Sequence, residues 1–135
     1  MHQAAALPFR RLNQRDDAIE VLLVNSSSNR WIIPKGDIDD GMEAHLAAEK
    51  EAFEEGGVRG RIEPKCLGKF ETRKEQDGAV TFVEVAVFPL EVEEELDRWP
   101  EMDGRERRWL PLDEAVEDIC EPELAAIVTN FFIRR

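Results

Sequence analysis

Three glutamates gather immediately before a pair of glycines near the middle of the chain. Glu51, Glu54 and Glu55 are three and four residues apart, so a helix places them within one turn and on one face. Gly56-Gly57 ends that helix, because glycine readily adopts the left-handed conformation at a helix C-terminus. The helix dipole is negative there, so each acidic side chain lowers the stability of the helix by about 0.3–1 kcal/mol. The pattern indicates either a solvated acidic face or a carboxylate site for Mg²⁺ or Mn²⁺.

The chain has 135 residues, of which 42% are hydrophobic, so we expect a single domain over residues 1–135. Its net charge of −12 opposes nonspecific binding to nucleic acid or to anionic membranes. Cys66 and Cys120 match no metal-binding spacing, and the N-terminal apolar run is too short for a signal peptide or a membrane span. We therefore expect a reduced, cytoplasmic protein without a membrane partner. Monomer and homodimer both stay open.

Short apolar and β-branched runs, separated by turn residues, predict a sheet interrupted by one central helix. We expect strands at residues 4–12, 19–24, 31–33, 58–62, 66–72, 79–92 and 107–110. Helices are expected at 44–55 and 112–119, and a last helix begins at Pro122. Turns or loops are expected at 13–17, 25–29, 35–41 and 73–78, with a loop or short helical turn at 91–97. This order predicts a mixed α/β layer fold.

The apolar residues of the central and last helices predict which helix faces are buried. In the central helix, Leu46, Ala47 and Phe53 have core-facing spacing, which places the carboxylates on the opposite face. In the last helix, apolar residues recur at i, i+3, i+4, i+7 and i+8, so we expect one stripe to pack on the sheet. Its members are Leu124, Ile127, Val128, Phe131 and Phe132.

The spacing around the central helix resembles the Nudix box, G-x5-E-x7-R-E-U-x-E-E-x-G-U, in which U is a bulky aliphatic residue. The residues that match in register are Gly36, Glu51, Glu54, Glu55, Gly57 and Val58. Three positions depart from it: Met42 replaces a glutamate, Lys50 replaces the arginine, and Ala52 is smaller than usual. Lysine provides a point charge where arginine provides a planar fork, so we expect a less rigidly held triad.

Two further segments, SSSNRWIIPKG before the box and DGRERRWLPLDEAV after it, resemble the diphosphoinositol polyphosphate phosphohydrolase branch of the Nudix family. The resemblance implies an α/β/α sandwich with a mixed β-sheet and an enzyme that hydrolyses a diphosphate bond. Clustered carboxylates suit this chemistry, because phosphoryl transfer depends on positioning and on neutralising charge.

The resemblance also implies roles for individual residues. Glu51, Glu54 and Glu55 would be catalytic and would hold Mg²⁺ or Mn²⁺ together with the backbone carbonyl of Lys35 or Gly36. Glu51 is a candidate general base, although the carboxylate that takes this role varies within the family. Many members add an acidic ligand from a later strand or loop, and the candidates here are Glu84, Glu94 and Glu95.

Basic residues near the box are candidates for binding substrate phosphates, because arginine forks and lysine charges suit phosphate. They are Arg10, Arg30, Lys35, Arg73, Lys74, Arg105 and Arg108. The favoured substrate is a phosphorylated small molecule, either a dinucleoside polyphosphate or a diphosphoinositol polyphosphate. A nucleoside diphosphate sugar or an RNA 5′ end is the alternative. Met42 and Lys50 also motivate a different hypothesis, a noncatalytic Nudix domain that binds a nucleotide or phosphate ligand.

Overall fold

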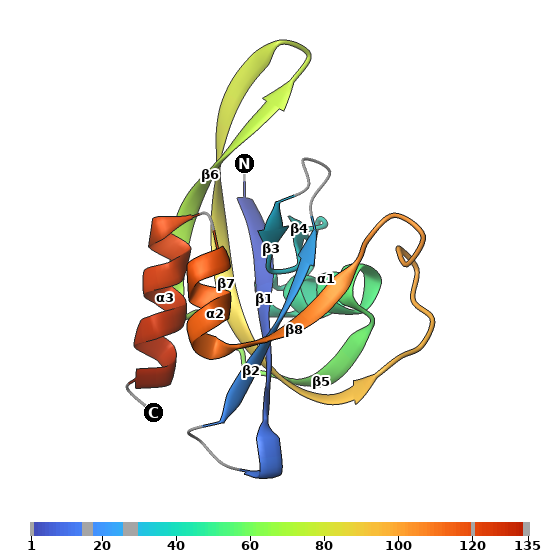
Figure 1. The fold of residues 1–135 in the computed structure, drawn as a ribbon. Coiled ribbons are helices and arrows are strands. Elements are labelled where there is room, and N and C mark those ends of the chain that lie inside the picture. The colour runs from blue at the N-terminus through green and yellow to red at the C-terminus, as the bar shows by residue number, and fades with distance from the viewer. Residues whose placement is uncertain (1, 15–17, 26–29, 120, 134–135) are drawn as a thin grey trace.

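A computed structural model describes residues 2–14, 18–25, 30–119 and 121–133 (Figure 1). Within these ranges the chain forms one eight-stranded mixed sheet with helices on both faces. The predicted α/β class and the sandwich architecture are therefore confirmed. The predictions for residues 15–17, 26–29 and Cys120 fall outside the described residues.

Two long strands form the centre of the sheet and run parallel to each other. β1 (His2–Arg11) pairs with β7 (Ala79–Glu95) along residues 84–91 of β7. The other strands are β2 (Ile19–Asn25), β3 (Trp31–Ile32), β4 (Lys35–Asp37), β5 (Val58–Ile62), β6 (Gly68–Gln76) and β8 (Arg107–Pro111). Their described pairings are antiparallel. The central order is β3-β2-β1-β7-β5, with β4 added to β1, β6 to β7 and β8 to β2.

Three segments that the sequence predicts as turns or loops are paired strands. Residues 35–37 form β4, which pairs with the start of β1. The acidic run continues β7 to Glu95, opposite Val58 of β5, so a loop or helical turn was the wrong prediction there. The turn between β6 and β7 is reduced to Asp77-Gly78, and the resulting ribbon projects beyond the helices (Figure 1). These polar residues form strands because their backbone groups pair with neighbouring strands. The context of the sheet outweighs their low intrinsic preference for strand structure.

The helices cover the two faces of the sheet. They are α1 (Ala44–Gly56), α2 (Leu112–Asp118) and α3 (Pro122–Ile133), and a short 3₁₀ turn, η1 (Leu12–Gln14), follows β1. Because side chains alternate along a strand, Ala5 and Leu7 belong to the core under α2 and α3, whereas Ala4 and Ala6 belong to the core under α1. All members of the predicted α3 stripe are buried in, or packed against, the first of these cores, which confirms that prediction.

The face that α1 packs on the sheet matches the prediction only at Ala47, because Leu46 and Phe53 lie outside the core beside β1. Ala47 and Ala52 are fully or almost fully buried in the core beside β1, whereas Leu46 is 41% exposed. The small side chains of Ala47 and Ala52 let the helix approach the sheet closely. Glu51 and Glu55 lie on this buried face, so the prediction that the carboxylates face away from the core was wrong for these two.

Candidate active site

Glu51 and Glu55 form the centre of the candidate site. They lie one turn apart on α1, are 9% and 5% exposed, and their carboxyl groups are hydrogen-bonded to each other. The backbone N–H of Lys35 donates to Glu55 Oε1 at 3.3 Å. On the other side, Arg105 Nη2 lies 3.5 Å from Glu55 Oε2. The acidic pair is thus held between β4 and the segment that joins β7 to β8.

Gly36 lies directly against the carboxyl group of Glu51. A Cβ atom at position 36 would lie 2.5 Å from Glu51 Cδ and 2.6 Å from Oε1. The pairing of β4 with β1 places Gly36 opposite Ala4 and so holds it in this position. The first glycine of the motif therefore makes room for a carboxylate of the same motif.

We expect Gly36→Ala to reduce kcat/KM by about tenfold to a hundredfold, because the added methyl group displaces the Glu51 carboxylate. Steady-state kinetics measures this effect, and thermal unfolding checks that the variant is folded. Gly104→Ala is the matched control, since a Cβ at Gly104 meets nothing within 4 Å. Wild-type kcat/KM in Gly36→Ala would contradict the assigned position of Glu51.

Burial controls the protonation of the acidic pair. It raises the pKa of Glu55 from its ordinary value of 4.5 to about 8, with Arg105 acting in the opposite direction and Glu51 adding to the rise. Burial also raises the pKa of Glu51, and the neighbouring charge of Glu54 adds to that effect. At neutral pH the pair therefore readily holds a proton.

We expect the metal-free protein to lose stability as the pH rises from about 4.5 to about 8. In this window the folded state keeps a proton on Glu55 that the unfolded state loses, so the free energy of unfolding falls with increasing pH. Urea unfolding in EDTA, from about pH 5 to about pH 8, measures this slope in the wild type and in Glu55→Gln. The variant should have the flatter profile. Equal slopes would contradict a raised Glu55 pKa.

The donor set suits a divalent cation, although the acid triad is not assembled as one cluster. Across the described ranges, no three His, Cys, Asp or Glu side chains lie in a metal-holding arrangement. Glu54 Oε2 instead lies 4.0 Å from Lys50 Nζ. A cation would nevertheless favour the ionised form of Glu51 and Glu55, because it opposes their desolvation and mutual repulsion. The two buried carboxyl groups thus suit a divalent ion. Glu54 lies next to them on the same helix and could provide a third carboxyl group.

The departures from the Nudix box have local structural roles. Lys50 donates to Asp39 Oδ2 at 2.8 Å, so its main partner is the loop before α1 and not the buried pair. This hydrogen bond raises the pKa of Lys50. Met42 packs against the core beneath α1. Ala52 is fully buried in that core, where a larger side chain would push α1 away from β1.

Two of the predicted phosphate-binding residues, Lys35 and Arg105, lie near the acidic pair. Lys35 is within electrostatic range of Glu55 and Arg105, and burial lowers its pKa. Its Nζ donates to Gln3 Oε1 at 3.2 Å. These two cations form a basic rim near Glu55, whereas Lys74 acts on Lys35 from the projecting β6–β7 ribbon.

The remaining predicted cations lie elsewhere or are exposed. Three of these cations form ion pairs with nearby acids: Arg10 with Glu20, Arg73 with Glu75, and Arg108 with Asp118. Arg10 is six residues along β1 from Ala4, the partner of Gly36, which corresponds to about 20 Å. Arg73 lies on the projecting β6–β7 ribbon. Arg30 is exposed immediately before β3.

Arg108 and Arg107 point to opposite faces of the sheet, because neighbouring residues alternate along β8. Arg108 stacks over Trp31, whose side chain packs against the core under α2 and α3. Arg107 donates to the carbonyl oxygen of Gly56 at the end of α1. Arg108 was a predicted site residue and Arg107 was not, because only the register of β8 determines which of two adjacent arginines points towards the end of α1.

The additional acid near the pair is Glu101 and not one of the three predicted candidates. Glu101 Oε1 accepts a hydrogen bond from Arg105 Nε at 3.2 Å, and its charge acts to raise the pKa of both Glu51 and Glu55. The predicted acids have other ion-pair partners: Glu84 pairs with Lys69, Glu94 with Arg59, and Glu95 with Arg107, which also contacts the end of α1. Glu101 lies in an irregular segment, where no sequence periodicity indicates the direction of a side chain.

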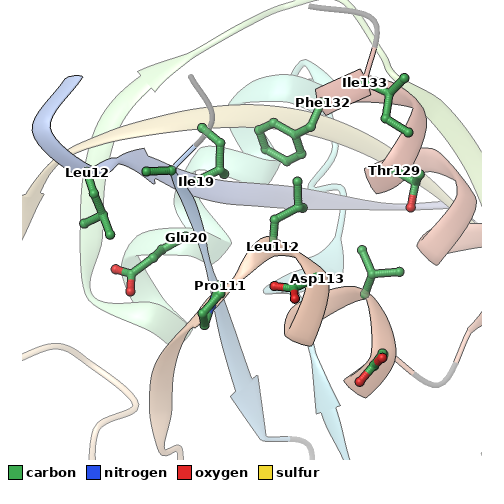
Figure 2. A pocket seen from close by; sticks show the side chains of 12 residues that line it. Leu12, Ile19, Glu20, Pro111, Leu112, Asp113, Thr129, Phe132 and Ile133 are labelled. Atoms are coloured by element: carbon green, nitrogen blue, oxygen red, sulfur yellow. The ribbon is translucent and has the colours of Figure 1, made fainter. Parts of the chain in front are cut away.

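A cavity of about 790 Å³ lies apart from this site, between η1, the start of β2, α2 and α3 (Figure 2). Leu12, Ile19, Leu112 and Phe132 contribute apolar side chains to it, and Glu20 lies near its edge. None of the three α1 glutamates lines this cavity, so its size does not identify the catalytic centre.

The family model described as the NUDIX domain matches residues 1–131. This chain belongs to the Nudix family. It is 37% identical over 141 residues to "Nudix hydrolase 16, mitochondrial" from Arabidopsis thaliana, covering 95% of this chain and 78% of that protein. It is also 37% identical over 119 residues to "Diphosphoinositol polyphosphate phosphohydrolase 3-alpha" from Mus musculus, covering 85% and 66%. The predicted hydrolase family is thereby confirmed.

Solved structures agree on the fold. An Ap4A hydrolase from C. elegans superimposes with a TM-score of 0.69 at 23% identity, covering 96% of this Nudix chain and 93% of that chain. The chain spans about three fifths of the length of five further Arabidopsis thaliana Nudix hydrolases that it matches. Within the described ranges, no helix is both long and apolar enough to cross a membrane.

Proposed function

We propose that this Nudix chain hydrolyses a diphosphate bond in a highly phosphorylated small molecule, with Mg²⁺ or Mn²⁺ as cofactor. The observation that carries this proposal is the buried Glu51–Glu55 pair beside the basic residues Lys35 and Arg105. Carboxylates suit the ion, and the basic rim suits phosphate. The favoured substrates, a diphosphoinositol polyphosphate or a dinucleoside polyphosphate, correspond to the names of two similar proteins.

The α1 glutamates have the central chemical role in this proposal. Glu51, Glu54 and Glu55 would hold the ion together with the backbone carbonyl of Lys35 or Gly36. A bound ion supplies Lewis-acid activation of phosphate oxygens and of the attacking water. Glu51 is the proposed general base, because a raised pKa makes a carboxylate a better acceptor of a proton from water.

The basic rim would orient the substrate phosphates. Arg105 contacts Glu55 and Glu101 and presents a planar fork, whereas Lys35 adds a point charge. A phosphate near Lys35 would favour its charged form, which burial disfavours. Arg30, exposed before β3, stays a candidate for contacts farther from the reacting phosphorus.

A substrate panel tests the proposal. It contains a diadenosine polyphosphate, a diphosphoinositol polyphosphate, a nucleoside diphosphate sugar and a 5′-capped or triphosphorylated RNA, each assayed with Mg²⁺ and with Mn²⁺. Products formed in ¹⁸O-labelled water identify the phosphorus that is attacked. Preferential turnover of either of the first two substrates supports the proposal. Preference for the sugar or the RNA would replace the substrate class and leave the chemistry unchanged.

A noncatalytic ligand-binding domain is the second candidate function. Lys50 pairs with Asp39, and Glu54 is not clustered with the buried pair, so the acid triad departs from a ready-made metal centre. Binding of metal and ligand without turnover on the panel would support this candidate. Turnover that disappears in Glu54→Gln would rule it out.

The predictions of compartment and assembly stay predictions. Two Arabidopsis thaliana proteins that are 37% identical to this chain are named as mitochondrial. The names of similar proteins therefore do not support the cytoplasm alone. Monomer and homodimer are both compatible with an acidic pair that is contributed entirely by one chain.

A further inference from the structure

The segment of residues 96–106 is attached to the C-terminal end of α1. The backbone N–H of Leu96 donates to Gly57 O at 2.8 Å, and that of Glu101 donates to Glu54 O at 3.0 Å. The segment has no strand or helix of its own except turns near residues 100–104. Its placement therefore depends on contacts with its surroundings.

Trp99 and Arg107 provide the side-chain part of this attachment. Trp99 Nε1 donates to Glu55 O at 3.0 Å. Arg107 Nη1 donates to Gly56 O at 3.0 Å, and its Nη2 donates to Leu96 O at 2.6 Å. The guanidinium carbon lies 3.9 Å from the centroid of the Trp99 ring. One stacked pair thus satisfies carbonyls at the end of α1 and holds the start of the segment.

The same segment carries Arg105, which reaches the acidic pair. Arg105 contacts Glu55 and Glu101, and its Nη1 donates to Asn25 O at 2.6 Å. Arg105 lies two residues before Arg107, so the anchoring of Arg107 restricts the backbone from which Arg105 projects. A shift of about 1 Å in such a group is enough to weaken catalysis markedly.

We propose that Trp99 and Arg107 are positioning residues that attach the 96–106 segment to the end of α1. This attachment holds Arg105 beside Glu55, where it binds substrate phosphate. Neither residue contacts the reacting atoms. The kinetic part of this inference rests on the proposed function, whereas the docking of the segment can be measured without any substrate.

Limited trypsin digestion tests the docking. Arg98 is exposed within the segment, so cleavage after it reports how often the segment detaches. We expect Arg107→Met to accelerate this cleavage by about tenfold, which is more than the accompanying loss of global stability accounts for. Arg59→Met is the matched control, because Arg59 also stacks on an aromatic ring of α1, Phe53, at 4.5 Å but does not touch the segment. Cleavage of Arg107→Met at the wild-type rate would overturn the proposal.

Kinetics separates a positioning role from a merely structural one. We expect Arg107→Met to raise KM by about tenfold with kcat changed less than about threefold, because a misplaced Arg105 loses phosphate binding. Arg107→Lys should recover part of the loss. If Arg107→Met does not fold, Trp99→Phe decides, since it keeps an aromatic face for Arg107 and removes the donor to Glu55 O. Faster cleavage without a KM change would also overturn the proposal. If the wild type shows no turnover, only the proposed function is contradicted. Trypsin digestion then still tests the attachment of the segment to α1.

Discussion

Glu51→Gln and Glu55→Gln are each expected to lower kcat by at least about 10²–10³-fold, because each removes a carboxylate that would hold the divalent ion. Both side chains are buried on α1 and are hydrogen-bonded to each other, so the isosteric amide preserves shape while it removes charge. Initial rates with the best substrate, at saturating Mg²⁺ and Mn²⁺, measure the loss.

The same two variants should be at least as stable as the wild type near pH 8 in EDTA. Burial disfavours the ionised carboxylate, and an amide carries no such cost. Adding Mg²⁺ should reverse the order, since ion binding to the folded state raises the melting temperature of the wild type alone. This combination of lost activity and retained stability would distinguish a functional acidic pair from a structural one.

Glu49→Gln is the matched control for these substitutions. Glu49 lies on the same helix, but it lines a separate pocket between α1 and β5, together with Leu46, Phe53, Arg59 and Gly60. It should leave kcat and the Mg²⁺ effect unchanged. Unaltered kcat in both Glu51→Gln and Glu55→Gln would contradict the assigned site, and an equal loss in Glu49→Gln would show that the effect is not specific to the buried pair.

Gly57→Ala is expected to lower the free energy of unfolding by about 2–4 kcal/mol, which corresponds to a melting temperature lower by roughly 5–15 °C. Gly57 caps α1 with φ of 64°, a conformation that costs alanine about 1–2 kcal/mol. The added Cβ would also lie 2.6 Å from Arg107 Nη1 and 2.8 Å from the Trp99 ring. Urea and thermal unfolding measure the change.

Gly41→Ala separates the two contributions to this loss. Gly41 has φ of 80°, but a Cβ there meets nothing within 4 Å, so only the backbone cost applies. We expect Gly41→Ala to cost about 1–2 kcal/mol, less than Gly57→Ala. Equal losses in the two variants would mean that Arg107 and Trp99 move aside freely and do not constrain the end of the helix.

Much of the fold could be predicted because hydrophobic periodicity is local. The α3 stripe and the strands containing Val21 and Val85 carry apolar residues at the spacing that their final packing uses. α1 was less predictable, because its buried face consists of alanines and glutamates while Leu46 is exposed. A hydrophobicity pattern points to the larger side chains, whereas this helix needs small residues near β1 and buries acids for chemistry.

The sequence by itself determined that Glu51, Glu54 and Glu55 share one helical turn and that the helix ends at a glycine, since spacing and capping are local properties of the chain. Only the tertiary structure decided that Glu51 and Glu55 turn towards the sheet, that Gly36 fits against them, and that Arg105 joins them. Strand pairing and the path of the 96–106 segment bring these residues together across about 15 to 70 positions of sequence. No local pattern encodes such distant contacts.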